Sequence, residues 1–257
     1  MERFTFNEFL KEQFYNETLN PKFWNQDQEF DPDIRKKLLE IAEDFAESVG
    51  VSDEVQDIQL TGSLANYNYT KYSDLDVHIL LDFKDINKDE DLVKRALDGK
   101  RFVWNTRHDI KIRGHEVELY FQDVDEPHKA SGLYSILDDQ WLTTPVYDPP
   151  SVDERDVLKK AEQWEKDIDW LKEKIAKNKD NPKELTRLSE YGNKIRTKIQ
   201  EMRKDSLEKD GEFGIGNLAF KHLRNTKAIE TLINLTNKAY DLVYTESSFS
   251  KYYKETY

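Results

Sequence analysis

The spacing of apolar residues predicts two helices in the first half of the chain. In the segment 32–49, PDIRKKLLEIAEDFAESV, apolar side chains recur at steps of three and four, which places them on one face of a helix. Pro32 suits the first turn of this helix and Gly50 its end. A second helix is expected over residues 89–107.

Two segments between these helices are predicted to be β-strands, and the second has the two-residue alternation of a strand. VQDIQL (55–60) predicts a short strand that runs into Thr61-Gly62-Ser63. DLDVHILL (74–81) predicts a second strand with one apolar face, formed by Leu75, Val77, Ile79 and Leu81. The opposite face of the second strand carries two aspartates, a residue type that strands disfavour.

Two further segments complete the first half. Residues 110–124, IKIRGHEVELYFQDV, are typical of a β-hairpin that turns near Arg113 and Gly114. Residues 126–141 combine Pro, Ser-Gly and aromatic residues. They are expected to form a connection with a short helix that ends in a buried Trp141.

The character of the sequence changes after Pro145, Pro149 and Pro150. Three long helices are expected beyond this point, with Ser151 and Glu154 forming a capping box for the first. Pro182 and the EFGIG segment separate them, so that they span residues 152–178, 183–209 and 217–244. The sequence therefore predicts an α/β (α+β) domain with a mixed sheet over residues 1–148, followed by an all-helical domain over residues 149–257.

Composition limits the class of protein. The chain has 257 residues, of which 12% are aromatic, and it has no Cys. The absence of Cys excludes disulfides, thiolate metal sites and a Cys nucleophile, and it suits a reducing compartment. No apolar run reaches the length of a transmembrane span, and the first residues lack the apolar core of a signal peptide. We therefore expect a soluble, cytoplasmic protein without a membrane partner.

Acidic residues concentrate in the first domain. The net charge is −13; residues 1–150 hold 17 Lys and Arg against 32 Asp and Glu, a net of −15, and residues 151–257 hold 22 against 20, a net of +2. An acidic domain argues against strong binding to duplex nucleic acid. It suits a site that concentrates metal cations, although a solvated acidic surface is the more frequent explanation of such a charge.

The candidate chemistry lies on the two predicted strands and the hairpin. Asp74 and Asp76 are two positions apart on one strand, so their carboxylates point the same way and can chelate Mg²⁺. Gly62 lets the backbone approach a ligand closely, and Ser63 with nearby N–H groups can hold phosphate oxygens. Glu118, between Val117 and Leu119 on the hairpin, supplies a third acid.

This series resembles the motif of the nucleotidyltransferase superfamily of the DNA polymerase β type. The family pattern of a hydrophobic residue and Gly-[Gly/Ser], then Asp-x-Asp on a strand, then a later acid, is matched here by Leu60-Thr61-Gly62-Ser63, Ser73-Asp74-Leu75-Asp76-Val77 and Glu118. The resemblance covers residues 34–122. The chain departs from it in having Glu as the third acid, where Asp is commoner, and Glu116 is a rival for that role.

The helical remainder, including residues 217–241, is similar to uncharacterised nucleotidyltransferase-domain proteins of tailed bacteriophages, which implies the host cytoplasm for a phage-encoded chain. The family resemblance also implies a fold and an activity. These are the nucleotidyltransferase fold and the Mg²⁺-dependent transfer of an NMP from an NTP such as ATP to an acceptor hydroxyl, with release of pyrophosphate.

Specific roles follow from the resemblance. Asp74, Asp76 and Glu118 would hold two Mg²⁺ ions, which Mn²⁺ can replace, and Gly62 and Ser63 would bind the nucleotide phosphates. The acceptor is left open as a small molecule, a protein side chain, an RNA end or a second nucleotide. The resemblance further suggests residues 126–141 as a loop near the nucleotide, as an alternative to a simple connection.

Two other functions fit the same residues. One is a catalytically silent module that binds a nucleotide or a protein and has kept the fold. The other is a phosphohydrolase that uses the same acids; it ranks lower because Gly62-Ser63 is suited to a triphosphate tail. Each acid also has a simpler explanation: Asp74 and Asp76 as charges on a strand edge, and Glu118 as a cross-strand partner of Lys111 or Arg113.

Overall fold

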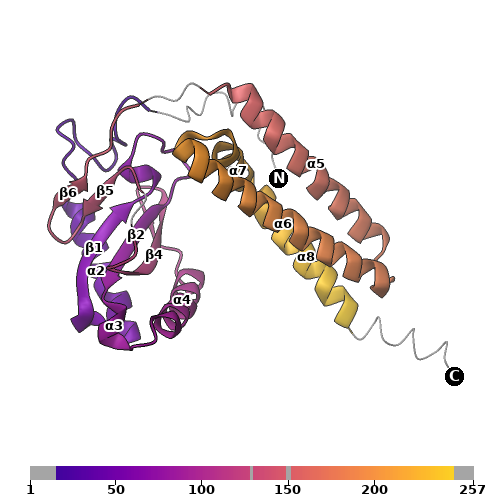
Figure 1. Ribbon diagram of the computed structural model, residues 1–257, viewed down its shortest axis with the longest axis horizontal. Coiled ribbons are helices and arrows are strands. Elements are labelled where there is room, and N and C mark those ends of the chain that lie inside the picture. Colours follow the sequence, from indigo (N-terminus) through magenta and orange to yellow (C-terminus); the bar gives the residue numbers. More distant parts are fainter. Residues whose placement is uncertain (1–15, 128–129, 149–151, 246–257) are drawn as a thin grey trace. The chain divides into compact units, whose positions relative to one another are not determined.

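The chain folds into two compact units that meet in sequence at Pro149 and Pro150. Figure 1 shows the computed structural model, which describes residues 16–127, 130–148 and 152–245. The first unit is a mixed α/β structure and the second is helical. Within the described residues there are seven α-helices and one six-stranded sheet.

A mixed sheet with the strand order β3-β4-β2-β1-β5-β6 forms the centre of the α/β unit. The pair β2 and β4 is parallel, and the other neighbours are antiparallel. The strands are β1 (Val55–Thr61), β2 (Leu75–Leu81), β3 (Lys111–Ile112), β4 (His115–Asp123), β5 (Leu133–Ser135) and β6 (Gln140–Thr143). The hairpin predicted near Arg113 and Gly114 is confirmed as β3 and β4, and both turn residues have positive φ angles, 52° and 89°.

Three helices accompany the sheet, and the two long ones were predicted. They are α2 (Pro32–Val49), α3 (Phe83–Ile86) and α4 (Glu90–Arg107). The Asp31 carboxylate caps α2 by accepting the N–H groups of Asp33 and Ile34, and Gly50 ends it in the left-handed conformation that glycine adopts readily. The predicted positions of Pro32 and Gly50 are therefore confirmed.

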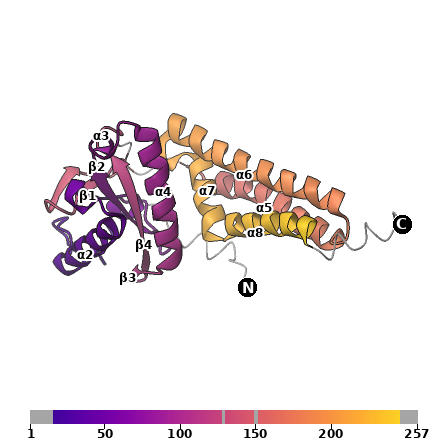
Figure 2. The ribbon, with the colours of Figure 1, turned by 90° about the horizontal axis from the view of Figure 1, so that it is seen from below.

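The sheet has one apolar face and one polar face. Leu75, Val77, Ile79 and Leu81 are all 0% exposed, as the alternation of β2 predicts. On this side Phe45 of α2 packs against Phe121 of β4 at 4.6 Å and against Trp104 of α4 at 5.0 Å between ring centroids. These contacts place α2 and the Trp104 side of α4 on the apolar face; Figures 1 and 2 show both helices beside the sheet. The polar side chains that alternate with the apolar ones on β2 and β4 therefore lie on the opposite face.

The prediction of a connection with a short helix over residues 126–141 is wrong. Strands β5 and β6 extend the sheet in this segment. Trp141 lies on β6, where its ring stacks on Trp24 at 4.4 Å and its Nε1 donates to the Gln28 carbonyl at 3.0 Å. Strands of three and four residues are too short for their periodicity to be recognised in sequence, and these contacts with the segment 24–28 stabilise them.

The helical unit contains four helices where three were predicted. They are α5 (Glu154–Lys177), α6 (Pro182–Asp210), α7 (Ile215–Asn225) and α8 (Ala228–Tyr244). The expected helix over 217–244 is interrupted because Lys227 adopts a left-handed conformation, with φ 58°, which ends α7 and starts α8. The N-cap of α5 is Asp153; Ser151, which was expected to cap it, lies outside the described residues.

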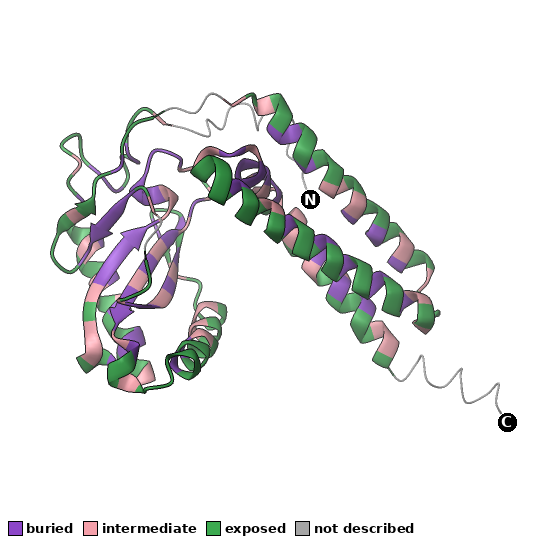
Figure 3. Ribbon diagram, in the orientation of Figure 1, coloured by how far each residue is buried: buried purple, intermediate pink, exposed green. Residues whose placement is uncertain are grey.

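Close helix contacts hold this unit together. A Cβ atom at Gly192 of α6 would lie 2.2 Å from Thr236 Oγ1 of α8, so only glycine permits the observed approach of these helices. The buried residues of α5, α6 and α8 form stripes along helices that are otherwise exposed, as in Figure 3. None of the helices that the structure describes is both long enough and apolar enough to cross a membrane.

The break at Lys227 can be tested with paired substitutions. We expect Lys227→Val to unfold more easily than Lys227→Gly by about 1–2 kcal/mol, because a Cβ-branched residue is strained at a positive φ. At Lys238, an exposed position within α8, the order should reverse, since glycine costs about 1 kcal/mol in a helix interior. Urea unfolding followed by circular dichroism measures both pairs; the same order at both positions would contradict a left-handed break.

Candidate active site

The strand register brings two of the predicted acids side by side. Asp76 of β2 lies directly opposite Glu118 of the parallel strand β4, and opposite Thr61 of β1 on its other side. Neighbouring strands are about 4.8 Å apart, so the two acids are adjacent residues in a row Thr61–Asp76–Glu118 across three strands. Both acids are half-buried, and two carboxylates so placed repel each other unless a proton or a cation intervenes.

Gly62 is packed directly against the Asp76 carboxylate. A Cβ atom added to Gly62 would lie 2.1 Å from Asp76 Oδ2, which is far inside van der Waals contact. The backbone there has φ 76° and ψ −160°, a conformation that is almost exclusive to glycine. This contact explains why position 62 is a glycine: only a residue without a side chain allows the turn after β1 to approach the Asp76 side chain so closely.

Ser63 is bonded to the residue that precedes the first aspartate. It begins a short 3₁₀ helix, Ser63–Ala65, and its hydroxyl lies 2.7 Å from the hydroxyl of Ser73, which also accepts the Thr70 N–H at 2.9 Å. This bond joins the turn after β1 to the entry of β2. In the structure Ser63 thus supports the site, and binding of phosphate by its hydroxyl remains a proposal.

Asp74 lies immediately before β2 and not within it. The strand begins at Leu75, so the prediction of a strand from residue 74 is one residue too long. Asp74 is held through its neighbour: the Ser73 carbonyl accepts from Nδ1 of His115 at 2.6 Å. Burial lowers the pKa of His115, so the ring is neutral and Nδ1 acts as the donor.

The two candidates for the third acid have different surroundings. Glu116 is exposed and lies 3.5 Å from Lys111, its partner across the β3–β4 hairpin. Glu116 therefore has the role of cross-strand partner that was the simpler explanation for Glu118. Glu118 faces Asp76, and its carboxylate accepts a hydrogen bond from the hydroxyl of Tyr120. The geometry favours Glu118 over Glu116 as the companion of Asp76.

Tyr120 is a site residue that the sequence analysis missed. Burial, the Glu118 carboxylate and Asp76 together raise the pKa of its hydroxyl above the usual range, so the hydroxyl stays protonated and donates to Glu118. The Arg101 guanidinium of α4 lies 4.9 Å from the centre of its ring, and the His78 ring stacks on it at 4.9 Å. The alternation Glu118-Leu119-Tyr120 places the two side chains on one face and is the signal that could have identified it.

The acids have the chemistry of a metal site but are not gathered into one. Carboxylate oxygens suit Mg²⁺, and the Gly62 turn packs directly against the Asp76 carboxylate. Across residues 16–127, 130–148 and 152–245, however, no group of three His, Cys, Asp or Glu side chains is arranged to hold a metal ion. Asp76 and Glu118 are neighbours across β2 and β4, and the Glu118 carboxylate is hydrogen-bonded to Tyr120. Asp74 precedes β2 and has no place in this strand pairing.

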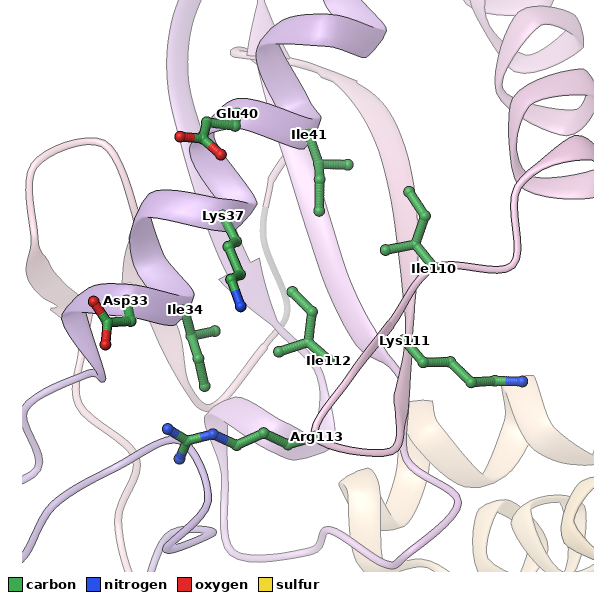
Figure 4. A pocket seen from close by; sticks show the side chains of 9 residues that line it. All are labelled: Asp33, Ile34, Lys37, Glu40, Ile41, Ile110, Lys111, Ile112 and Arg113. Carbon is green, nitrogen blue, oxygen red and sulfur yellow. The ribbon is translucent and has the colours of Figure 1, made fainter.

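A pocket on the α2 side of the sheet contains none of the predicted site residues. It measures about 420 Å³ and lies between α2 and the segment that leads into β3. Four isoleucines form its apolar part, and charged side chains surround them (Figure 4): Ile34, Ile41, Ile110 and Ile112 with Asp33, Lys37, Glu40, Lys111 and Arg113. Two of the three cations of this pocket, Lys111 and Arg113, are engaged with acids, Asp109 at 2.9 Å and Asp31; the third is Lys37.

The contact between Gly62 and Asp76 can be measured with a mutant cycle. We expect Gly62→Ala to lower the free energy of unfolding by about 1–3 kcal/mol more in the wild type than in an Asp76→Ala background, because the shorter side chain removes the overlap. Gly211 is a matched control: it has φ 69° and ψ −160°, and a Cβ there meets nothing within 4 Å. Gly211→Ala therefore reports backbone strain alone. Equal costs of Gly62→Ala in both backgrounds would show that Asp76 does not contact the turn.

Comparisons of this chain with protein-family models, with curated proteins and with solved structures find no match.

Proposed function

We propose that this chain is a metal-dependent nucleotidyltransferase, which moves an NMP from an NTP to an acceptor hydroxyl and releases pyrophosphate. The observation that carries the proposal is the pairing of Asp76 with Glu118 beside the glycine turn at Gly62. A half-buried pair of like charges costs stability, and such pairs cluster at functional sites. The order of the elements supports the same function: a strand, a Gly-Ser turn, an antiparallel strand with acids, then a parallel strand with a further acid.

Each residue then has a part in the reaction. Asp74, Asp76 and Glu118 would hold Mg²⁺, which when bound neutralises phosphate charge and lowers the pKa of the acceptor hydroxyl. The turn at Gly62 and Ser63 would present backbone N–H groups to the phosphate tail. Tyr120 would keep one oxygen of Glu118 in place through its hydroxyl, and so orient the other.

The transfer itself is an in-line displacement. The acceptor oxygen forms a bond to the α-phosphorus, and the bond from that phosphorus to the bridging oxygen breaks. Pyrophosphate leaves with that electron pair, and the proton of the acceptor hydroxyl passes to the Glu118 carboxylate or to water. Little covalent chemistry is required of the protein, so positioning and charge complementarity supply most of the rate enhancement.

A labelling experiment tests this function. We expect purified protein with Mg²⁺ or Mn²⁺ to transfer label from one of four α-³²P NTPs to a species in cell lysate, and Asp76→Asn to reduce transfer by about 10²-fold or more. Lys100→Ala, at an exposed position of α4, is the control and should keep the wild-type rate. Release of labelled NMP to water alone would indicate a phosphohydrolase. If the protein shows no transfer and no thermal shift with Mg²⁺ and NTP, the catalytically silent binding module becomes the better explanation.

The role of Tyr120 gives a second test. Tyr120→Phe removes only the hydroxyl that donates to Glu118, so we expect kcat to fall by about 10–100-fold and the Mg²⁺ requirement to rise. Tyr134→Phe is a matched control, because the Tyr134 hydroxyl donates to Asp139 on a different part of the sheet. Steady-state kinetics over a range of Mg²⁺ concentrations would compare the two. An unchanged rate in Tyr120→Phe would remove Tyr120 from the site.

A further inference from the structure

A second pocket lies beside the row of acids, on the polar face of the sheet. It measures about 680 Å³, within the range of about 300–1,000 Å³ that is usual for small-molecule sites. Its walls come from three strands, from α4 and from the segment after β4. The polar and charged side chains that line it include His78, Lys94, Asp98, Arg101, Tyr120 and Gln122.

The pocket joins the acids through Thr61. Thr61 lines the pocket and is also the residue opposite Asp76 in the β1–β2 pairing. His78, which lines the pocket, is two positions from Asp76 on β2, a distance of about 6.8 Å along a strand. A molecule in the pocket is therefore placed next to the paired carboxylates, where an acceptor hydroxyl is needed.

The charges around the pocket balance one another. Lys94 forms an ion pair with Glu126 at 3.0 Å, and Arg101 lies 3.6 Å from Asp98. A phosphorylated ligand or a nucleic-acid end requires cations that are not already matched by acids, and a polyamine requires acids that are not matched by cations. The paired acids beside the pocket, Asp76 and Glu118, are the ones that the proposed function assigns to Mg²⁺, so with the metal bound the pocket favours a ligand without net charge.

The polar groups of the sheet favour a ligand with many hydroxyl groups. Nε2 of Gln122 donates to the Glu126 carbonyl at 3.2 Å, so its Oε1 is the acceptor for Nδ1 of His78 at 2.6 Å. Gln59, opposite His78 on β1, donates from Nε2 to Asp57 at 2.7 Å, and its Oε1 is buried with no hydrogen-bond partner among the described residues. Gln59 does not itself line the pocket, so this acceptor calls for a buried water molecule, which would lie between Gln59 and the hydroxyls of a bound molecule.

We propose that this pocket binds the acceptor, and that the acceptor is an uncharged, polyhydroxylated small molecule of the sugar or polyol class. Vicinal hydroxyls suit the planar amide, carboxylate and guanidinium groups of the lining. The inference rests on the proposed function for its chemistry. It names the acceptor class, which that function leaves open.

The test measures binding with Mg²⁺ but without nucleotide, so it does not depend on catalysis. The full chain is mixed with D-glucose, maltose and myo-inositol as neutral probes, and with glucose 6-phosphate and spermidine as charged probes, and saturation-transfer NMR detects the bound ones. Asp98→Trp places a large side chain at the pocket wall on α4. Lys100→Trp is the matched control, since Lys100 is exposed on the same helix and does not line the pocket.

We expect at least one neutral probe to bind the wild type and Lys100→Trp, and to bind Asp98→Trp about tenfold or more weakly. Thermal unfolding of both variants establishes that they are folded. Binding of no neutral probe, equal binding by Asp98→Trp, or preference for a charged probe would each overturn the inference. If a neutral probe binds in this pocket but no NTP transfer is detected, the proposed function fails while the assignment of the pocket stands.

Discussion

The arrangement of the α/β unit depends on the close approach of the Gly62 turn to the Asp76 carboxylate. The turn leaves β1 with a backbone conformation that other residues avoid, and it occupies the space that a side chain would need. Strand β2 then pairs with β1 so that Asp76 faces the turn, and β4 pairs with β2 so that Glu118 follows. The acids, their tyrosine and the neighbouring pocket all take their places from this one contact.

Hydrogen bonds hold the residues around this contact in place. His115 and Ser63 fix Ser73 from two sides, and Tyr120 fixes Glu118. The opposite face is a dry core of aliphatic and aromatic residues beneath α2 and α4. A rigid apolar layer under a hydrogen-bonded polar layer is an arrangement that can keep costly charges in place, because the core supplies the stability that the charges remove.

The sequence predicts the parts of this unit that have long, regular periodicity. Ile34 to Val49 and Leu75 to Leu81 give their helix and strand directly, and Pro32 and Gly50 give the ends of that helix. It does not predict β5 and β6, because strands of so few residues show too little periodicity and tertiary contacts such as that of Trp24 with Trp141 stabilise them. It also does not predict the break at Lys227, which rests on the backbone conformation of a single residue. For the site, spacing identifies Gly62, Asp76 and Glu118, but the hydroxyl of Tyr120 and the guanidinium of Arg101 reach it only through the register and the path of α4.

The parallel pairing of β2 with β4 also has a consequence for how the molecule forms. His78 and Gln122, which meet across this pair, are 44 positions apart, because the chain must pass through α3 and α4 before it returns to the sheet. Closing a loop of this length costs conformational entropy, and the cost arises before the contacts between β2 and β4 can offset it. The unfolded chain keeps Asp76 and Glu118 far apart, so their repulsion arises only when β4 docks. We therefore expect docking of β4 to be the slow step of folding, and neutralisation of either acid to speed it.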